Sequence, residues 1–224
     1  MYMNFSSKYM KPALLATLLS ALAGCGGTEE LAKELDRTSN FTFVNALPYS
    51  ADFHLQKRNI ATDFSGLFDS SNRVYADLPK NEVSGVYAYK YKAINGMVNL
   101  GVRNSISKND EEKAYVGLGN NEDLWVIAWD AAGDNKLTQV DRKRSDQSGK
   151  LNVRIFADGT YPVSVNGNNA AATSKGGITD FYSLDNCNSS LKVNNKAIDL
   201  CGGDYGRSYL LVVDANGKKV LVRE

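Results

Sequence analysis

The sequence predicts an all-β fold, in which two antiparallel β-sandwich domains in tandem follow a signal peptide and a short tether. Short apolar or alternating runs are separated by turns rich in Gly, Asn and Asp along most of the chain, which is typical of strands joined by hairpins. Apolar runs with helical period are missing after residue 37. In addition, a buried strand, an Asp-Ala-x-Gly turn and a return strand occur twice.

Residues 1–24 have the layout of a secretory signal peptide. Lys8 and Lys11 are the only charged residues of this segment, and they precede an apolar run over residues 13–23 that ends at Gly24. The run is about a dozen residues long, shorter than the roughly 20 that a membrane-spanning helix needs. We therefore expect cleavage after this segment rather than a transmembrane span.

The tetrad Leu22-Ala23-Gly24-Cys25 resembles the lipobox of bacterial lipoproteins. In that family the cysteine sulfur receives a diacylglyceryl group, the chain is cut before the cysteine, and the new amino terminus is acylated. The resemblance implies that Cys25 is lipidated and holds the protein at a membrane through several acyl chains. Gly26 stands where lipoproteins of the inner membrane carry Asp, so the resemblance also implies the outer membrane, on its periplasmic or surface face. The alternative is an ordinary signal peptide followed by a chance cysteine.

The charge of the mature chain argues against a nucleic-acid partner. Without residues 1–24 the chain has 24 Lys and Arg against 25 Asp and Glu, a net charge of −1. A nucleic-acid-binding domain would need a clustered basic surface. A mature chain of roughly 200 residues allows one large or two small domains.

The distribution of polar segments divides the mature chain into four parts. Residues 25–39 are the lipidated N-terminus and tether, 40–141 the first β-sandwich domain, 142–149 a linker without apolar side chains, and 150–224 the second β-sandwich domain. Strands of the first domain are expected near residues 41–47, 52–56, 83–92, 97–102 and 124–129. Strands of the second are expected near residues 151–156, 161–167 and 208–222.

The two domain ends match each other. Residues 125–133 and 209–217 align at a constant offset of 84, and each is a buried strand with an Asp-Ala-x-Gly turn. In such a hairpin the Asp side chain bonds the turn backbone, and Gly adopts positive φ. We interpret the match as an internal duplication of one immunoglobulin-like sandwich module.

Two short stretches, Val44-Asn45-Ala46-Leu47-Pro48 and Val163-Ser164-Val165-Asn166-Gly167, resemble the envelope β-sandwich family known as domain of unknown function 4397. They cover a small part of the chain. The resemblance implies a sandwich fold in the cell envelope, and it supplies no activity.

Cys187 and Cys201 remain once Cys25 is assigned to the anchor. An even pair in an oxidising compartment predicts a disulfide, which would close a 15-residue loop and contribute about 3 kcal/mol in the chain-entropy model. The alternative, a redox or metal pair, lacks Cys-x-x-Cys spacing and a nearby histidine.

Residues typical of catalysis or metal binding are few. His54 is the only histidine and lies in an alternating strand, so we expect a structural or surface role. Ser105 and Lys108 have the Ser-x-x-Lys spacing of penicillin-binding enzymes, but that chemistry needs the serine at a helix start. The acidic turns lack the spacing of the twelve-residue calcium loop, so no metal or cofactor is expected; they are residues 109–112, Asp130 with Asp134, and Asp214 with Asn216.

Aromatic residues are the better candidates for a ligand surface. Tyr87, Tyr89 and Tyr91 recur with period two and share one face of a strand, while Lys90 and Lys92 lie on the other. If the tyrosine face is exposed, it is a platform for sugar or protein contact; if it is internal, the rings are core residues. The Trp125 and Trp129 side chains also share a face, and their apolar strand predicts core packing.

Together these features favour a lipid-anchored envelope protein that acts as a non-catalytic binding or structural module, with an envelope protein or glycan as its partner. The first alternative is a hydrolase of envelope polymers, which would need a deep pocket with convergent acids or a nucleophile and base. The second is an assembly or chaperone lipoprotein that adds a strand to a client, which would need an uncovered sheet edge.

Overall fold

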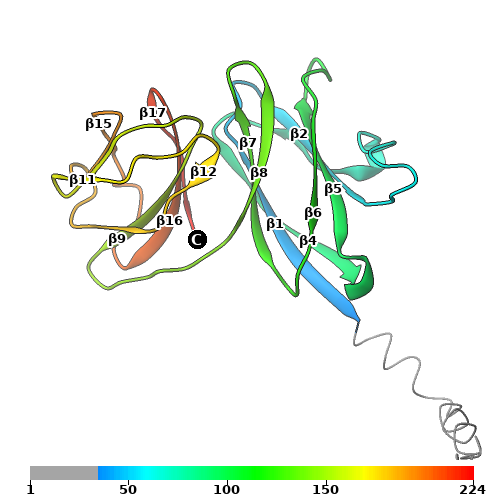
Figure 1. Cartoon of the computed structure of the whole chain (residues 1–224), viewed down its shortest axis with the longest axis horizontal. Helices are drawn as coiled ribbons and strands as arrows, with labels where there is room; N and C mark the ends of the chain where they lie inside the picture. Colours follow the sequence, from blue (N-terminus) through cyan, green and yellow to red (C-terminus); the bar gives the residue numbers. More distant parts are fainter. Residues whose placement is uncertain (1–34) are drawn as a thin grey trace, which may run out of the picture. The chain divides into compact units, whose positions relative to one another are not determined.

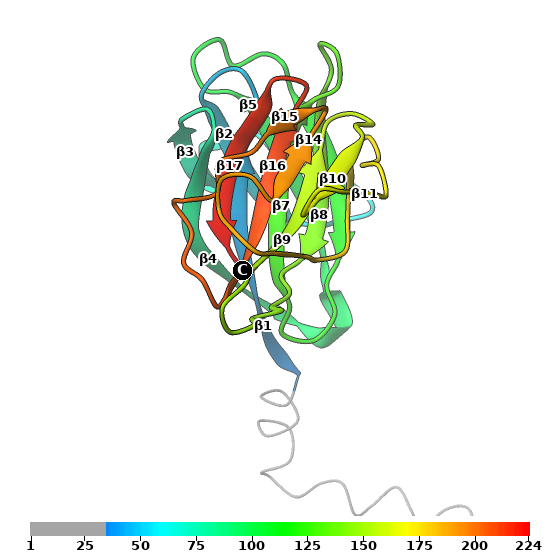
Figure 2. The same cartoon turned by 90° about the vertical axis from the view of Figure 1, so that its left-hand side faces the viewer.

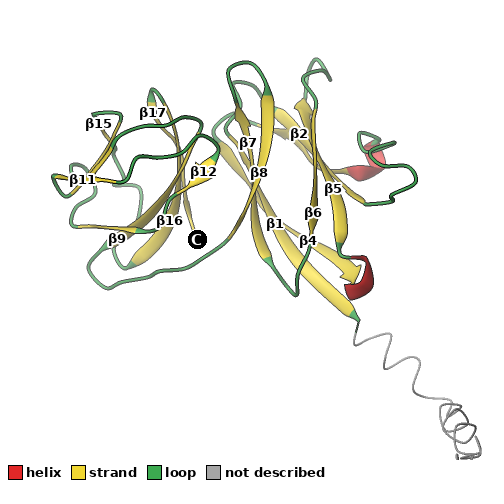
Figure 3. Ribbon diagram, in the orientation of Figure 1, coloured by secondary structure: helices red, strands yellow, loops and turns green. Residues whose placement is uncertain are grey.

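The computed structural model describes residues 35–224, so the predicted signal peptide, Cys25 and most of the predicted tether lie outside the described residues. The regular elements of the described part are strands, apart from two single-turn 3₁₀ helices (Figure 3). This confirms the all-β sandwich class. Residues 37–224 form one compact unit, and no helix among the described residues is long and apolar enough to cross a membrane.

The first half of this unit contains eight strands and both 3₁₀ helices. Their bounds are β1 Asp36–Asn45, β2 Ala51–Lys57, η1 Ser70–Asn72, β3 Arg73–Leu78, β4 Glu82–Lys92, η2 Ala93–Asn95, β5 Met97–Asn104, β6 Glu112–Gly117, β7 Asp123–Asp130 and β8 Asn135–Asp141. One sheet has the order β4-β1-β7-β8 and the other β3-β2-β5-β6. Alternate apolar side chains of both sheets meet in a core that includes Phe41, Phe43, Phe53, Leu100 and Val126.

The second half repeats this arrangement with shorter strands. Their bounds are β9 Leu151–Ala157, β10 Val163–Val165, β11 Asn168–Ala170, β12 Gly177–Ile178, β13 Tyr182–Leu184, β14 Leu191–Val193, β15 Lys196–Ala197, β16 Arg207–Asp214 and β17 Gly217–Arg223. One sheet has the order β12-β9-β16-β17, with β13 also on β9, and the other β11-β10-β14-β15. Their core includes Val153, Ile155, Leu191, Val193 and Leu211.

The first strand of each half pairs in parallel with the last strand but one. Strand β1 is parallel to β7, and β9 is parallel to β16, whereas the hairpin neighbours run antiparallel as predicted. Each first strand therefore lies inside its sheet, unlike the edge position of the first strand in an immunoglobulin constant domain. The shared strand order in both halves supports the interpretation of an internal duplication.

The register of these parallel pairs corrects the offset of the repeat. Phe43 lies opposite Val126, and Ile155 lies opposite Leu211. Val126 and Leu211 therefore hold equivalent core positions in the two halves, at an offset of 85 residues. At the offset of 84, Val126 would match Leu210, which faces away from its own sandwich core. Strand β7 thus runs one residue further than β16 before the Asp of its turn.

A third apolar cluster joins the two halves. Trp125 and Trp129 from β7 pack there against Phe156 and Val212 of the second half, which confirms the predicted core role of both tryptophans. The outer face of sheet β4-β1-β7-β8 is therefore covered by sheet β12-β9-β16-β17 (Figures 1 and 2). This explains why residues 124–129 are apolar on both faces. Whether each half is also an independent domain stays a prediction.

A buried ion pair lies at the edge of this third cluster. The Glu224 side chain is fully buried and pairs with Arg154 Nε, while Arg154 Nη2 donates to the Asp141 carbonyl at 2.5 Å. The same carboxylate accepts from Trp125 Nε1 at 2.8 Å and from the Lys143 backbone N–H at 3.2 Å. Glu224 therefore connects strand β7, the linker and strand β9.

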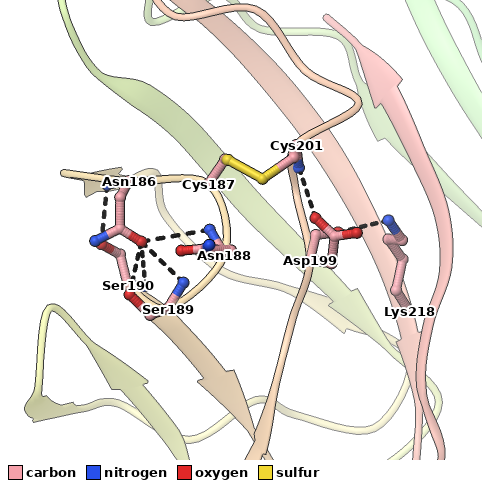
Figure 4. Close-up of a disulfide and its surroundings, with 8 residues drawn as sticks. All are labelled: Asn186, Cys187, Asn188, Ser189, Ser190, Asp199, Cys201 and Lys218. Carbon is pink, nitrogen blue, oxygen red and sulfur yellow. Dashed lines mark hydrogen bonds between the residues drawn. A yellow bond between two sulfur atoms is a disulfide. The ribbon is translucent and has the colours of Figure 1, made fainter.

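The predicted disulfide is present between Cys187 and Cys201, whose Cα atoms are 4.8 Å apart (Figure 4). Each cysteine lies in a loop beside the second sandwich core. The Asn186 side-chain oxygen accepts backbone N–H groups of residues 188–190, and the Cys201 N–H donates to Asp199. These bonds order the two loops that the disulfide joins.

Candidate functional site

An open groove of about 820 Å³ lies at one end of the first sandwich. It lies between the loop that leaves β2 and the turn that contains η2. Three of its side chains are apolar and exposed: Ile60 by 85%, Ile94 by 77% and Met97 by 40%. The rest of its lining is Gln56, Lys57, Arg58, Asn59, Thr62, Asn95 and Gly96.

The loop on the β2 side is braced by Arg58. Its guanidinium pairs with Asp63 at 3.1 Å, bonds Asn99 at 3.0 Å, and lies 4.3 Å from the centre of the Tyr115 ring. The Asn59 side chain accepts the Ala61 N–H at 2.9 Å. Ile60 is thus held in solvent by a turn that these hydrogen bonds and the ion pair stabilise, and its side chain does not contribute to the core.

The turn on the β5 side is held against residues 118–119. A Cβ on Gly96 would lie 2.8 Å from the Leu118 carbonyl oxygen, so only glycine permits this close approach. Tyr91 bonds both the Gly119 carbonyl and, at 3.3 Å, the Ser39 hydroxyl. The groove is therefore connected to the beginning of β1, which lies beside η2 in Figures 1 and 3.

A second cluster of polar residues covers the outer face of β2 and β5. Asp52 is fully buried, with its Oδ2 at 2.8 Å from Lys108 Nζ, 3.6 Å from Arg73 Nη1 and 3.9 Å from Arg103 Nε. Burial raises the pKa of Asp52, but hydrogen bonds from Lys108 and the Asp77 N–H, with the nearby positive charges, outweigh it and lower this pKa overall. Cations from β3, from β5 and from the turn after β5 thus surround one carboxylate of β2.

His54 is fully buried beside this cluster. Its ring packs edge-on against Phe68 at 5.0 Å between centroids, and neither ring nitrogen has a hydrogen-bond partner among the described residues. Burial, with the charge of Arg103, lowers the pKa of His54 to about 4. The neutral ring therefore serves in packing against Phe68 on the outer face of the sheet. This agrees with the structural role that was one of the two predicted for His54.

The Ser-x-x-Lys tetrad does not bring its two functional groups together. Asn104 accepts the backbone N–H groups of Ile106 and Ser107, which makes a tight turn rather than a helix start. The Lys108 ammonium is bonded to Asp52, and the buried Ser105 hydroxyl has no partner within the described range.

Two of the acidic turns meet in a small pocket of about 230 Å³ lined by Asp110, Glu111, Glu112 and Asp134. Asn135 bonds the Asp110 carbonyl across it. Within residues 35–224, no three His, Cys, Asp or Glu side chains are placed to hold one metal ion. The sequence shows both turns, but not that they adjoin.

Of the two alternatives for the tyrosine face, the internal one agrees with the structure, and the exposed platform is wrong. Tyr87, Tyr89 and Tyr91 do share one face of β4, but that face points into the first sandwich: Tyr91 is buried, and the other two pack half-buried against the core. The Tyr89 and Tyr91 rings stack at 6.1 Å. The opposite face of β4 is exposed and carries Val86, Ala88 and Lys90.

No protein-family model matches the chain, and no curated protein matches it.

The groove is the feature that sequence reasoning missed. Its only signal is an isolated isoleucine in each of two polar turns, Ile60 and Ile94, which are 34 residues apart.

Proposed function

We propose that this protein is a lipid-anchored lipoprotein of the cell envelope, and that its two sandwich halves form a non-catalytic binding or structural module at the outer membrane. The observation that carries the proposal is the order of Lys8 and Lys11, the apolar run and the tetrad that ends at Cys25. The Cys187–Cys201 disulfide supports it, because such bonds persist in oxidising compartments.

We now place the proposed binding surface at the groove and not at the tyrosines of β4. The groove presents apolar tips beside amide and cationic groups, from Asn59, Asn95 and Lys57. No carboxylate, hydroxyl nucleophile other than Thr62, or imidazole lines it. This chemistry suits contact with a polar–apolar surface and does not favour the hydrolase.

The strand-addition alternative is not favoured by the edge strand β4. This strand ends its sheet and is long enough to accept a partner. Its sequence, however, carries Glu82, Lys90 and Lys92, and charges on an edge discourage pairing with another chain.

The test is the Cys25→Ser variant, expressed in a Gram-negative bacterium and labelled with a palmitate analogue. We expect loss of the lipid label and release from the membrane fraction. The matched control is Cys187→Ser with Cys201→Ser, which should keep the label. Membrane attachment of Cys25→Ser without a lipid label would refute the proposal. Affinity capture with the mature chain on envelope proteins and a glycan panel then addresses the partner.

A further inference from the structure

Three exposed apolar side chains gather at one end of the first sandwich, and we name Ile60, Ile94 and Met97 the basal patch. Isoleucine tips exposed by 77–85% are unfavourable in water. They are held out by turns that are themselves well bonded, as the Arg58–Asp63 pair and the Gly96 contact show. The patch is therefore a fixed feature of the surface.

The basal patch lies at the end of the sandwich where the chain enters the fold. The Tyr91 ring of β4 lies beside Gly96, and its hydroxyl bonds Ser39 of β1. Arg37 bonds Asn120 at 3.2 Å, next to the segment that packs on Gly96. The opposite end of the sandwich carries Ile106, which follows the last residue of β5, whereas Met97 is the first. Along the eight residues of β5, these ends are roughly 25 Å apart.

The chain length limits how far this end can be from the lipid. Ten residues, 26–35, separate Cys25 from the fold, and even a fully extended chain of that length spans at most roughly 35 Å. A surface held this close to a bilayer meets it at high effective concentration, so a small contact is enough. Three side chains are too few for a protein interface, which buries about 800 Å² on each partner.

We propose that the basal patch docks on the bilayer that holds the lipid of Cys25, with the isoleucine tips in the headgroup–acyl boundary. The proposal rests on the proposed lipid anchor. Lys57 and the amides of Asn59 and Asn95, which line the same groove, face the phosphate and glycerol groups. Docking orients the module, so that the Ile106 end points away from the membrane.

The experiment adds one cysteine at a time to the full-length lipoprotein, as Ile60→Cys or Ile94→Cys, with Ile106→Cys as the matched control. Ile106 is exposed by 86%, as much as Ile60. The native cysteines do not react, because Cys25 carries the proposed lipid or is replaced by serine, and Cys187 and Cys201 are joined. Lipidated protein is reconstituted in phosphatidylethanolamine–phosphatidylglycerol vesicles, and the rate of reaction with a membrane-impermeant maleimide is compared with that of the same variant carrying Cys25→Ser, without vesicles.

We expect the vesicles to slow labelling at positions 60 and 94 by fivefold or more and at position 106 by less than twofold. Equal rates at all three positions, in protein that floats with the vesicles, overturn the docking and leave the anchor standing. Protein with Ile106→Cys that fails to float overturns the anchor, and the docking with it. Slow labelling at positions 60 and 94 in the unlipidated form shows self-association and also overturns the proposal.

Discussion

Replacement of Glu224 by alanine should strongly destabilise the protein, because this side chain neutralises a buried cation. Arg154 is 4% exposed, and its Nε donates to the Glu224 carboxylate. In Glu224→Ala the guanidinium keeps only the Asp141 carbonyl as a strong partner. The indole N–H of Trp125 loses its acceptor as well.

The magnitude follows from the burial of the pair. Removal of one partner of a buried ion pair typically costs about 3–5 kcal/mol, because the remaining charge is left in a poorly solvated site. Replacement of both charges is much cheaper, since well-packed uncharged residues need no such compensation. We therefore expect Arg154→Met with Glu224→Gln to be more stable than Glu224→Ala by about 2 kcal/mol or more.

Urea unfolding followed by tryptophan fluorescence measures both variants. Trp125 and Trp129 are the only tryptophans of the chain, and both belong to the cluster between the halves, so the signal reports on this interface. The control is Glu111→Ala, which removes an exposed pair with Lys113 and should cost at most about 1 kcal/mol. A loss below about 1 kcal/mol in Glu224→Ala, or a double variant as unstable as the single one, would refute the reasoning.

Two further perturbations test the buried histidine and the packing between the halves. Since the pKa of His54 is lowered to about 4 in the folded protein, acidification from pH 6.5 to 4 protonates the unfolded chain first and should remove up to about 3 kcal/mol of stability. His54→Leu should flatten this part of the pH dependence of the urea midpoint; parallel curves for both proteins would contradict the buried, neutral ring. A Cβ at Gly176 would lie 2.6 Å from Trp129 Cζ2, so thermal unfolding should show Gly176→Ala to be less stable by about 1–3 kcal/mol than Gly167→Ala. Gly167 also has positive φ, but its Cβ would meet no atom within 4 Å; equal losses would exclude the clash.

The strands and the disulfide could be predicted because their signals are local. The run at residues 124–129 is apolar on both faces, and it does lie between two cores. The pairing of Cys187 with Cys201 followed from the count of cysteines, once Cys25 was assigned to the predicted lipid anchor. The period-two alternation of Tyr87, Tyr89 and Tyr91 was also correct as a statement about one face. It could not say which face is internal, since tyrosine is common both in cores and on surfaces.

The features that sequence could not supply depend on contacts between distant segments. The cations near Asp52 lie 21, 51 and 56 residues along the chain, at Arg73, Arg103 and Lys108. Arg154 and Glu224 are 70 residues apart. No spacing rule connects such pairs, because the strand order alone brings them together. The groove has the same origin, since the strand ends that form it meet only in the folded sandwich.

The covered outer face of β7 has a consequence for the order in which the chain is made. Synthesis starts at the N-terminus, so the sheet that contains β7 is complete some 80 residues before β16 and β17 exist to cover it. At typical elongation rates of about 5–20 residues per second, roughly 4–16 s pass before the strands that cover Trp125 and Trp129 have been synthesised. During that interval the nascent first half carries an apolar sheet surface of the kind that holding chaperones bind.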